Sequence, residues 1–291
     1  MRIRVPVATQ SIALADWLEV FMCLGQRSRV SRSKIRGLLR GILLVDGDSL
    51  QVAIELLFLE LTRRQQVIGD HYPFVVQDAH VSLTVVDNSL PYIFMLCLCM
   101  SEPLRTEGRQ SEVETLLDML VLDALSGYLS GSSRGVHFGW PTSGDRPPAF
   151  PAAIAWLAER LGLAVGKGQK RSARRDGGVD VVVWRPFNDR REGFVTILAQ
   201  CTIAVDWSEK AKDIVVDLWR GYIDFGKDPI TCLAIPYVIP HPFDKWDELR
   251  RTVHFVLDRL RICEILDGVD LSHRQRISEW TEAEMRVMNA A

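Results

Sequence analysis

The sequence predicts an α/β fold in which a mixed sheet is flanked by helices, with an N-terminal α+β domain before it. Residues 176–184 and 194–201 are rich in β-branched side chains and flank the polar segment 186–193, which is typical of an antiparallel hairpin. In the second half of the chain, helix-like segments alternate with strand-like segments, and this indicates strands covered by helices. In the first half, residues 80–86 alternate apolar and polar side chains after three helix-like segments.

The composition indicates a globular protein without a strong overall charge. The chain has 291 residues, of which 47% are apolar and 25% charged, so it can bury a core and hold two modest domains. The formal net charge is only −2, so no overall field attracts polyanions. Any binding of nucleic acid must therefore come from local basic patches.

The cysteines and the apolar runs indicate the compartment. Six cysteines lie in apolar runs and include no Cys-x-x-Cys pair, so we expect a reduced, cytoplasmic protein. The longest apolar run, residues 92–100, is about half as long as a membrane-spanning helix. We therefore expect a soluble protein with no membrane partner.

The first domain is expected to contain three helices and a β-hairpin. Residues 80–86 and 92–100 supply the two strands of the hairpin, and 87–91 connects them. Asp46–Ser49 is interpreted as a turn and helix cap rather than as the opening of a calcium loop, because the later acidic positions of such a loop are missing. The three expected helices cover residues 11–25, 31–43 and 50–66.

A polar segment rich in helix breakers, residues 101–111, is the best candidate for a domain boundary. We expect an N-terminal domain over residues 1–105, a second domain over 106–272 and a C-terminal helix over 273–291. Ser111 and Glu114 form a capping-box pattern at the start of the first helix of the second domain. Besides the hairpin over residues 176–201, we expect one strand and five helices in this part of the chain. The strand is 231–239, and the helices are 111–129, 150–161, 208–223, 245–266 and 272–288.

The hairpin predicts a candidate metal site. If it folds about Arg190, then Asp180 lies opposite Gln200, since both are ten residues from the pivot. A carboxylate and an amide oxygen on adjacent strands suit Mg²⁺ or another divalent cation. Aspartate is unfavourable before a run of valines unless it has a role, although it also suits the edge of a turn at Gly177 and Gly178. Gln200 fits cross-strand hydrogen bonding equally well.

The hairpin sequence resembles a known family of nucleases. Gly-Val-Asp-Val-Val at 178–182, followed across the hairpin by Ala-Gln-Cys at 199–201, resembles the PD-(D/E)XK nuclease superfamily, in particular its Mrr-like restriction endonuclease branch. The resemblance implies a restriction-endonuclease-like core of helix, three strands, helix and strand over residues 111–240. Either 134–139 or 163–165 would supply the first strand.

The resemblance also implies roles for single residues. Asp180 would be the metal-binding acid and Gln200 the second metal ligand, with Asp118 on the first helix as a further acid and Glu114 as its alternative. The family places a lysine two residues after the second ligand, where this chain has Thr202, which is neutral.

The next helix is expected to supply the missing lysine. Lys210 lies in its first turn and Lys212 is the second choice, while a solvated surface lysine is the plain alternative. A lysine in a first helical turn interacts unfavourably with the helix dipole, and this favours a functional role for Lys210.

A basic stretch before the hairpin is the candidate site for the phosphate backbone of DNA. A basic surface loop without a ligand is an equally good interpretation. Trp184, Trp207 and Trp219 are expected to be core residues rather than platforms for bases. The candidate nucleic-acid-binding residues are Lys167, Lys170, Arg171, Arg174 and Arg175.

The predicted function is that of a DNA phosphodiesterase that uses Mg²⁺ or Mn²⁺, and the resemblance implies a role in restriction or anti-phage defence. The low net charge favours a partner that delivers the DNA, such as an ATPase or helicase subunit, docked by the first domain. The rival is a catalytically inactive subunit of the same fold, which Thr202 favours. A third hydrolase hypothesis depends on Ser133 in Gly-x-Ser-x-Gly, which lacks the preceding strand of a nucleophile elbow.

Overall fold

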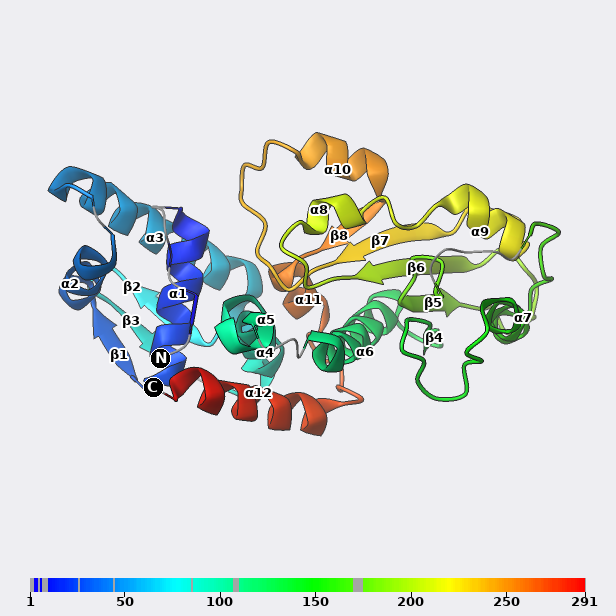
Figure 1. Cartoon of the computed structure of the whole chain (residues 1–291), viewed down its shortest axis with the longest axis horizontal. Coiled ribbons are helices and arrows are strands. Elements are labelled where there is room, and N and C mark those ends of the chain that lie inside the picture. The colour runs from blue at the N-terminus through cyan, green and yellow to red at the C-terminus, as the bar shows by residue number, and fades with distance from the viewer. Residues whose placement is uncertain are drawn as a thin grey trace.

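The structure is a computed structural model. It is elongated, with a mainly helical part that carries both termini and a larger sheet with helices on its two faces (Figure 1). Among the described residues, no helix is long and apolar enough to cross a membrane. The residues described are 3, 4, 6, 10–25, 27–43, 45–84, 86–106, 110–169 and 175–290.

The N-terminal part combines helices with a small antiparallel sheet. Its strands β1 (Arg29–Ser31), β3 (His80–Leu83) and β2 (Phe74–Gln77) pair in the order β1-β3-β2. The helices are α1 (Ser11–Leu24), α2 (Arg32–Ile42), α3 (Gly47–Ile68), α4 (Leu90–Met100) and the short α5 (Glu102–Thr106), with 3₁₀ turns η1 (Gly69–His71) and η2 (Asp87–Ser89).

The starts of two helices follow from capping residues. The side chain of Ser31 accepts a hydrogen bond from the Lys34 amide at 3.2 Å and begins α2. Asp46 accepts one from the Ser49 amide at 2.7 Å and begins α3. The prediction of a turn and cap at Asp46 is therefore confirmed.

The predicted β-hairpin over residues 80–100 is wrong in its second strand. Residues 92–100 belong to α4, and β3 pairs with β1 and β2 instead. Every residue from Pro91 to Met100 is buried, so the apolar run shows no alternation or helical period that could separate a strand from a buried helix. Pro91 lies in the first helical turn, where its missing N–H costs nothing, and it favours the helix over the strand.

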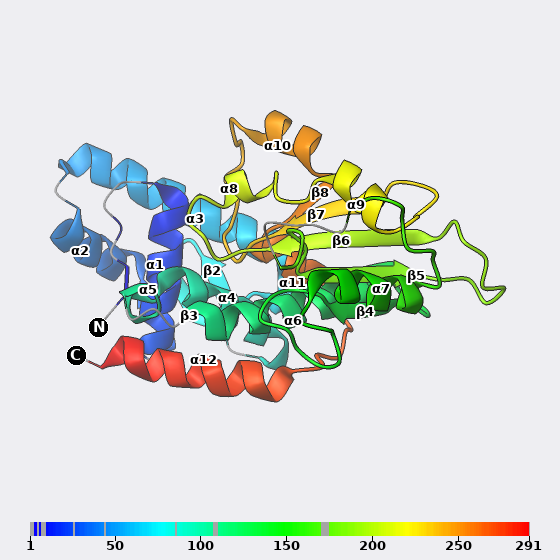
Figure 2. The ribbon, with the colours of Figure 1, turned by 45° about the vertical axis from the view of Figure 1, so that its right-hand side comes forward.

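The larger sheet has five strands in the order β4-β5-β6-β7-β8. The pairs β4/β5 and β5/β6 are antiparallel, whereas β6/β7 and β7/β8 are parallel, so the predicted mixed sheet is confirmed. Figure 2 shows the β5–β6 hairpin projecting from the helical part. The strands are β4 (Arg134–His137), β5 (Val181–Arg185), β6 (Val195–Cys201), β7 (Ile230–Ala234) and β8 (Phe255–Leu257).

The register of the hairpin matches the prediction from the sequence. Val181 pairs with Ala199 and Val182 with Leu198, which is the pairing that a pivot at Arg190 requires. Arg190 has a φ of 60°, in the left-handed region that tight turns use. The first strand, β4, comes from the segment 134–139.

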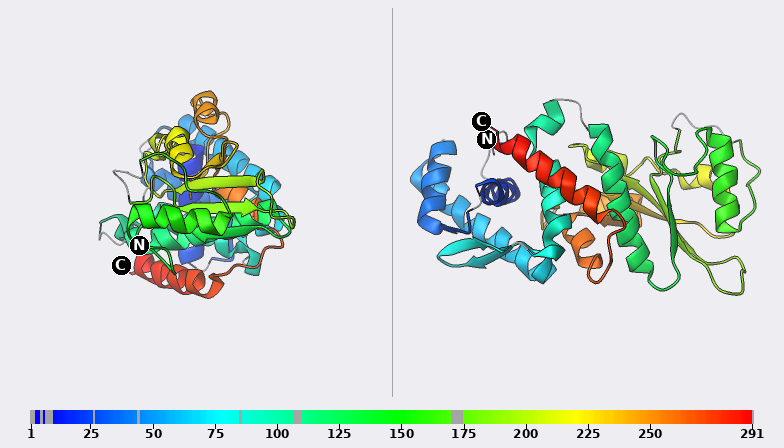
Figure 3. Two further views of the ribbon diagram at one scale, coloured as in Figure 1. Left: turned by 90° about the vertical axis from the view of Figure 1, so that its right-hand side faces the viewer. Right: turned by 90° about the horizontal axis from the view of Figure 1, so that it is seen from below.

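Helices cover both faces of the sheet (Figure 3). Val181 and Val183 pack into the core that α6 (Gln110–Leu129) and α11 (Arg259–Ile265) share with the N-terminal helices. Val182 and Trp184 pack on the other face, against α7 (Phe150–Leu161) and α9 (Val216–Tyr222). Since β5 is buried on both faces, it reads as a continuous apolar run rather than as an alternating one.

Two predicted helices are interrupted. The segment 208–223 contains α8 (Trp207–Lys210) and α9 with a turn between them, rather than one helix. The segment 245–266 contains α10 (Trp246–Thr252), then β8, then α11. Asp258 accepts a hydrogen bond from the Arg261 amide at 3.0 Å and so caps α11, which separates that helix from the strand before it. The final helix is α12 (Arg274–Asn289).

The apolar core continues across the predicted domain boundary. One cluster joins side chains of α1, α3 and α4 with those of α6, α11 and α12. Trp280 of α12 makes an edge-on contact with Phe94 of α4 at 5.3 Å between ring centroids. The predicted boundary after residue 105 therefore falls inside α5, and helices on both sides of it contribute to one core. The division into domains stays a prediction.

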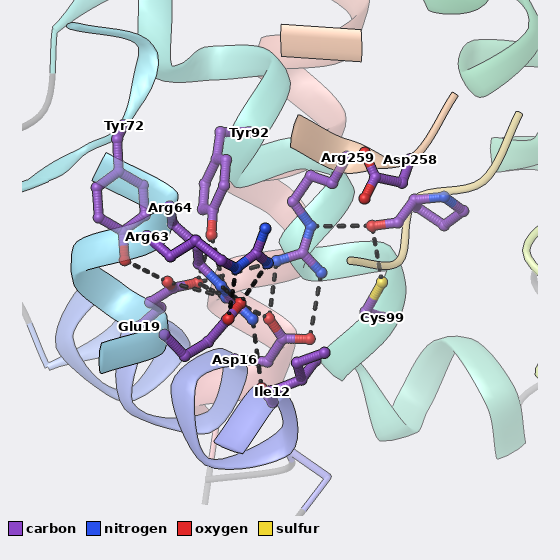
Figure 4. A network of polar contacts seen from close by, with 12 residues as sticks. Ile12, Asp16, Glu19, Arg63, Arg64, Tyr72, Tyr92, Cys99, Asp258 and Arg259 are labelled. Carbon is purple, nitrogen blue, oxygen red and sulfur yellow. Dashed lines mark hydrogen bonds and ion pairs between the residues drawn. The ribbon is translucent and has the colours of Figure 1, made fainter. Parts of the chain in front are cut away.

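A buried ionic network adds a polar link between the two ends of the chain (Figure 4). The side chains of Arg64 on α3 and Arg259 on α11 are both 0% exposed. Asp16 on α1 accepts from both, at 2.7 Å from Arg64 and 2.9 Å from Arg259. Glu19 accepts from Arg64 and from the hydroxyls of Tyr72 and Tyr92. Each buried charge in this network has an oppositely charged partner, as burial of an ion demands.

Candidate metal site

Asp180 lies directly before β5, between the ends of β4 and β6. Its amide donates to the Ala199 carbonyl at 2.9 Å, and its carbonyl accepts from the amides of Phe138 and Gly139. Its carboxylate atom Oδ2 accepts from Gln200 Nε2 at 2.6 Å and from the Cys201 amide at 2.8 Å. The predicted adjacency of Asp180 and Gln200 is confirmed, and the role of either residue as a metal ligand stays a prediction.

A second carboxylate and an imidazole lie beside Asp180. Asp118 is 7% exposed on α6, and its Oδ2 is 3.0 Å from Nε2 of His137 at the end of β4. The other ring nitrogen of His137, Nδ1, is 2.6 Å from the hydroxyl of Ser143. The sequence did not single out His137, since the histidines show no metal-ligand spacing. Its place in the segment 134–139, a candidate first strand, was the one available signal.

Cys201 completes a group of buried side chains that could hold a metal ion. Its sulfur and one carboxylate oxygen each of Asp118 and Asp180 all lie within 4.8 Å of one another. Burial raises the pKa of the Cys201 thiol well above its ordinary value, and the nearby carboxylates add to the effect. Cys201 is therefore a thiol, and its hydrogen bond with Asp118 has the sulfur as donor.

Gly139 leaves a small space among these side chains. A Cβ on Gly139 would lie 2.9 Å from His137 Nε2, 3.1 Å from Asp180 Oδ1 and 3.4 Å from Asp118 Oδ2. These three donor atoms come from β4, from the residue before β5 and from α6, and they surround the same point. Any larger residue at position 139 would fill that space.

The electrostatics of the group favour a bound cation or a bound proton. Burial, with a contribution from the charges of Glu114 and Asp176, raises the pKa of Asp118 to about 8, although the hydrogen bond from Cys201 lowers it. Burial and the charge of Asp118 also raise the pKa of Asp180 well above its ordinary value. Burial lowers the pKa of His137, so the imidazole is neutral near pH 7 and does not compensate the carboxylates.

Lys210 pairs with a different acid. Its Nζ is 3.8 Å from Asp213 Oδ2. Burial raises the pKa of Glu114, and the charge of Lys210 partly opposes that rise. Lys212 lies 3.4 Å from Glu209. Thr202 is buried, and its hydroxyl accepts from the Ala204 amide at 3.1 Å, so it has a local structural role. A catalytic role for Lys210 stays a prediction.

The predicted nucleic-acid-binding stretch is only partly described. Lys170, Arg171 and Arg174 lie outside the described residues, whereas Lys167 and Arg175 are exposed. The guanidinium of Arg175 lies 4.3 Å from the ring centroid of Trp140, a cation–π contact.

The other aromatic and hydroxyl candidates lie apart from the carboxylates. Trp184 and Trp219 are core residues, as predicted, and Trp207 is half-buried against Phe243. Ser133 donates its hydroxyl to the Ser126 carbonyl at 2.8 Å and precedes a strand rather than following one, so it forms no nucleophile elbow.

Comparisons of the chain with protein-family models, with curated proteins and with solved structures found no match. The chain is an α/β protein whose five-stranded mixed sheet is flanked by helices. It carries a buried group of Asp118, Asp180 and Cys201 that could hold a metal ion.

Proposed function

We propose that the protein is a metal-dependent phosphodiesterase that acts on DNA. The observation that carries this proposal is that Asp118 and Asp180 meet beside Gln200. Asp118 lies on α6, Asp180 directly precedes β5, and Gln200 lies on β6. From α6 to β7, the element order is helix, strand, helix, two strands, two short helices and strand. This order supports the resemblance to the PD-(D/E)XK core, with α7 inserted after the first strand.

The chain's own residues prepare the site for a cation. Two hydrogen bonds to Oδ2 fix the Asp180 carboxylate, and the Cys201 thiol and His137 contact that of Asp118. A divalent cation held by the carboxylates would neutralise a scissile phosphate and activate water. It would also offset the repulsion between the two buried acids.

The surroundings of the site offer contacts for a polyanion. Asp180 and Gln200 are each half-buried, so both keep some contact with solvent. Trp140, which follows Gly139 directly, is 41% exposed, and Arg175 on its ring directly precedes Asp176. A guanidinium suits phosphate oxygens, and an exposed indole suits base stacking.

A second candidate is a catalytically inactive subunit of the same fold. Thr202 occupies the position at which the family has a lysine, and Lys210 forms an ion pair with Asp213. In this case the fold would act as a scaffold or nucleic-acid clamp. The formal charge of −2 also favours, for either candidate, delivery of DNA by a partner such as an ATPase or helicase subunit.

The test is cleavage of plasmid and linear DNA by the purified full chain with Mg²⁺ or Mn²⁺. Cleavage is expected to be lost in Asp180→Asn and Asp118→Asn. It is expected to be kept in Asp189→Asn, a control on the exposed loop between β5 and β6. Cleavage that survives Asp180→Asn would contradict the proposal, and failure of the wild type to cut with either metal would favour the inactive subunit.

A further inference from the structure

Three donor atoms lie around the position that a Cβ at Gly139 would occupy. His137 Nε2, Asp180 Oδ1 and Asp118 Oδ2 lie 2.9, 3.1 and 3.4 Å from the position of a Cβ at Gly139. His137 Nε2 and Asp118 Oδ2 are 3.0 Å apart. Neighbouring ligands of an octahedral ion with bonds of about 2.1 Å are separated by about 3 Å. The two atoms can thus bind one ion with little movement.

Two of the three donor atoms are oriented by hydrogen bonds that their side chains make on the other side. Asp180 uses Oδ2 to accept from Gln200 Nε2 and the Cys201 amide, which leaves Oδ1 on the side of Gly139. His137 uses Nδ1 for the Ser143 hydroxyl, and this leaves Nε2 on the side of Asp118. Such an outer partner on the second ring nitrogen is usual for histidines that bind metals.

Gln200 has a different part in this arrangement. Its amide nitrogen is 2.6 Å from Asp180 Oδ2 and 2.9 Å from the Cys201 carbonyl oxygen. Both partners are acceptors, since Asp180 Oδ2 also receives the Cys201 amide N–H. The atom of Gln200 that faces them must be the NH₂ group. Gln200 is thus a positioning residue for Asp180.

We propose that His137, Asp118 and Asp180 are the protein ligands of the metal, and that this set selects Mn²⁺ or a later first-row ion over Mg²⁺. An imidazole nitrogen suits transition ions, whereas Mg²⁺ strongly prefers oxygen ligands. The inference rests on the metal site of the proposed function and does not depend on DNA cleavage. It replaces Gln200 by His137 in the ligand set that the sequence predicts.

The test is metal binding to the full chain, without DNA. Titration calorimetry is expected to show that Mn²⁺ binds at least about tenfold more tightly than Mg²⁺, since only the transition ion gains from the nitrogen ligand. His137→Ala is expected to remove this difference. His241→Ala, a control in an exposed loop, is expected to keep it. Circular dichroism of each variant verifies that it is folded.

A spectroscopic measurement on the unaltered protein avoids dependence on the variants. Pulsed electron paramagnetic resonance of bound Mn²⁺ is expected to show hyperfine coupling to one directly bound nitrogen. Bound Mn²⁺ without this coupling, equal affinity for both metals, or no binding of Mn²⁺ would overturn the inference. Nitrogen coupling in a protein that cuts no DNA would support the inference and count against the phosphodiesterase. Cleavage of DNA by a protein whose bound Mn²⁺ shows no nitrogen coupling would support the phosphodiesterase and overturn the inference.

Discussion

Gln200 donates a hydrogen bond from Nε2 to Oδ2 of Asp180 at 2.6 Å, across the antiparallel pair β5–β6. The contact fixes one oxygen of a half-buried carboxylate and directs the other towards Asp118 and His137. A hydrogen bond between two strands thereby determines the geometry of the candidate metal site.

Removal of the Gln200 amide is expected to weaken metal binding without removing a ligand. In Gln200→Ala, the carboxylate of Asp180 keeps the Cys201 amide but loses its side-chain donor. Loss of such an outer partner costs about 10–100-fold in metal affinity. Calorimetry with Mn²⁺ measures this, with Gln275→Ala on the exposed face of α12 as the control. Unchanged affinity in Gln200→Ala would show that the hydrogen bond does not position Asp180.

A methyl group at position 139 is expected to weaken metal binding strongly. In Gly139→Ala, the new Cβ would lie within 3.1 Å of His137 Nε2 and Asp180 Oδ1, in the space that the metal needs. We expect at least about a tenfold loss of Mn²⁺ affinity, comparable to the loss of a hydrogen-bond partner that orients a ligand. Gly41→Ala is the matched control, because a Cβ there meets no atom within 4 Å. Equal affinity in the two variants would place the metal elsewhere.

The stability of the metal-free protein is expected to fall as the pH rises from 3.8 towards 8. The pKa of Asp118 is raised from 3.8 to about 8 in the folded chain, so the folded state holds a proton that the unfolded state releases. Stability from this group is fully present below pH 3.8 and lost as pH passes about 8. Urea unfolding in the presence of a chelator, repeated between about pH 5 and 8, measures how the free energy of unfolding changes with pH.

Two comparisons test whether Asp118 causes this dependence of stability on pH. Asp118→Asn is expected to reduce it, because the amide does not titrate. Saturating Mn²⁺ is expected to reverse it, because binding requires the deprotonated carboxylates and becomes tighter as the pH rises. A slope that is the same in wild type and Asp118→Asn would show that Asp118 does not carry a raised pKa.

Loss of one member of the buried ionic network is expected to destabilise the protein strongly. Arg259→Ala would remove one of the two arginines that contact Asp16 and leave the acid with Arg64 alone. Breaking a buried pair from one side costs about 3–5 kcal/mol in the free energy of unfolding. Urea unfolding measures the loss, with Arg286→Ala, in an exposed pair with Glu282, as the control. Equal stability of the two variants would contradict this role for the network.

The sequence predicts local features of the fold better than choices made by tertiary packing. The register of the hairpin followed from the symmetric placement of Asp180 and Gln200 about Arg190 and is confirmed by the pairing of Val181 with Ala199. The helix α7 follows its pattern of apolar residues from Phe150 to Leu161. The α4 segment is apolar throughout, so its helical form depends on burial from all sides. The strand β8 was hidden in a longer apolar pattern because its three residues need β7 as a partner.

The candidate site was predictable in part. Asp180 disturbs a strand that is otherwise regular, and this local conflict identified it. Asp118 came only from the resemblance to a family, because a single acid on a helix carries no local signal. His137 reaches the site through the pairing of β4 with β5, in which His137 pairs with Val181, 44 residues further along the chain. No spacing rule connects residues across such a distance, and so His137 could not be chosen among the histidines from the sequence alone.

Anomalous X-ray diffraction from crystals of the full chain grown with Mn²⁺ is the most direct test of the metal site. The account predicts one strong peak beside Gly139, with His137 Nε2, Asp118 Oδ2 and Asp180 Oδ1 all at bonding distances of about 2.1–2.3 Å. A protein without a peak there at saturating Mn²⁺, or with a peak bound by Gln200 and not by His137, would contradict it.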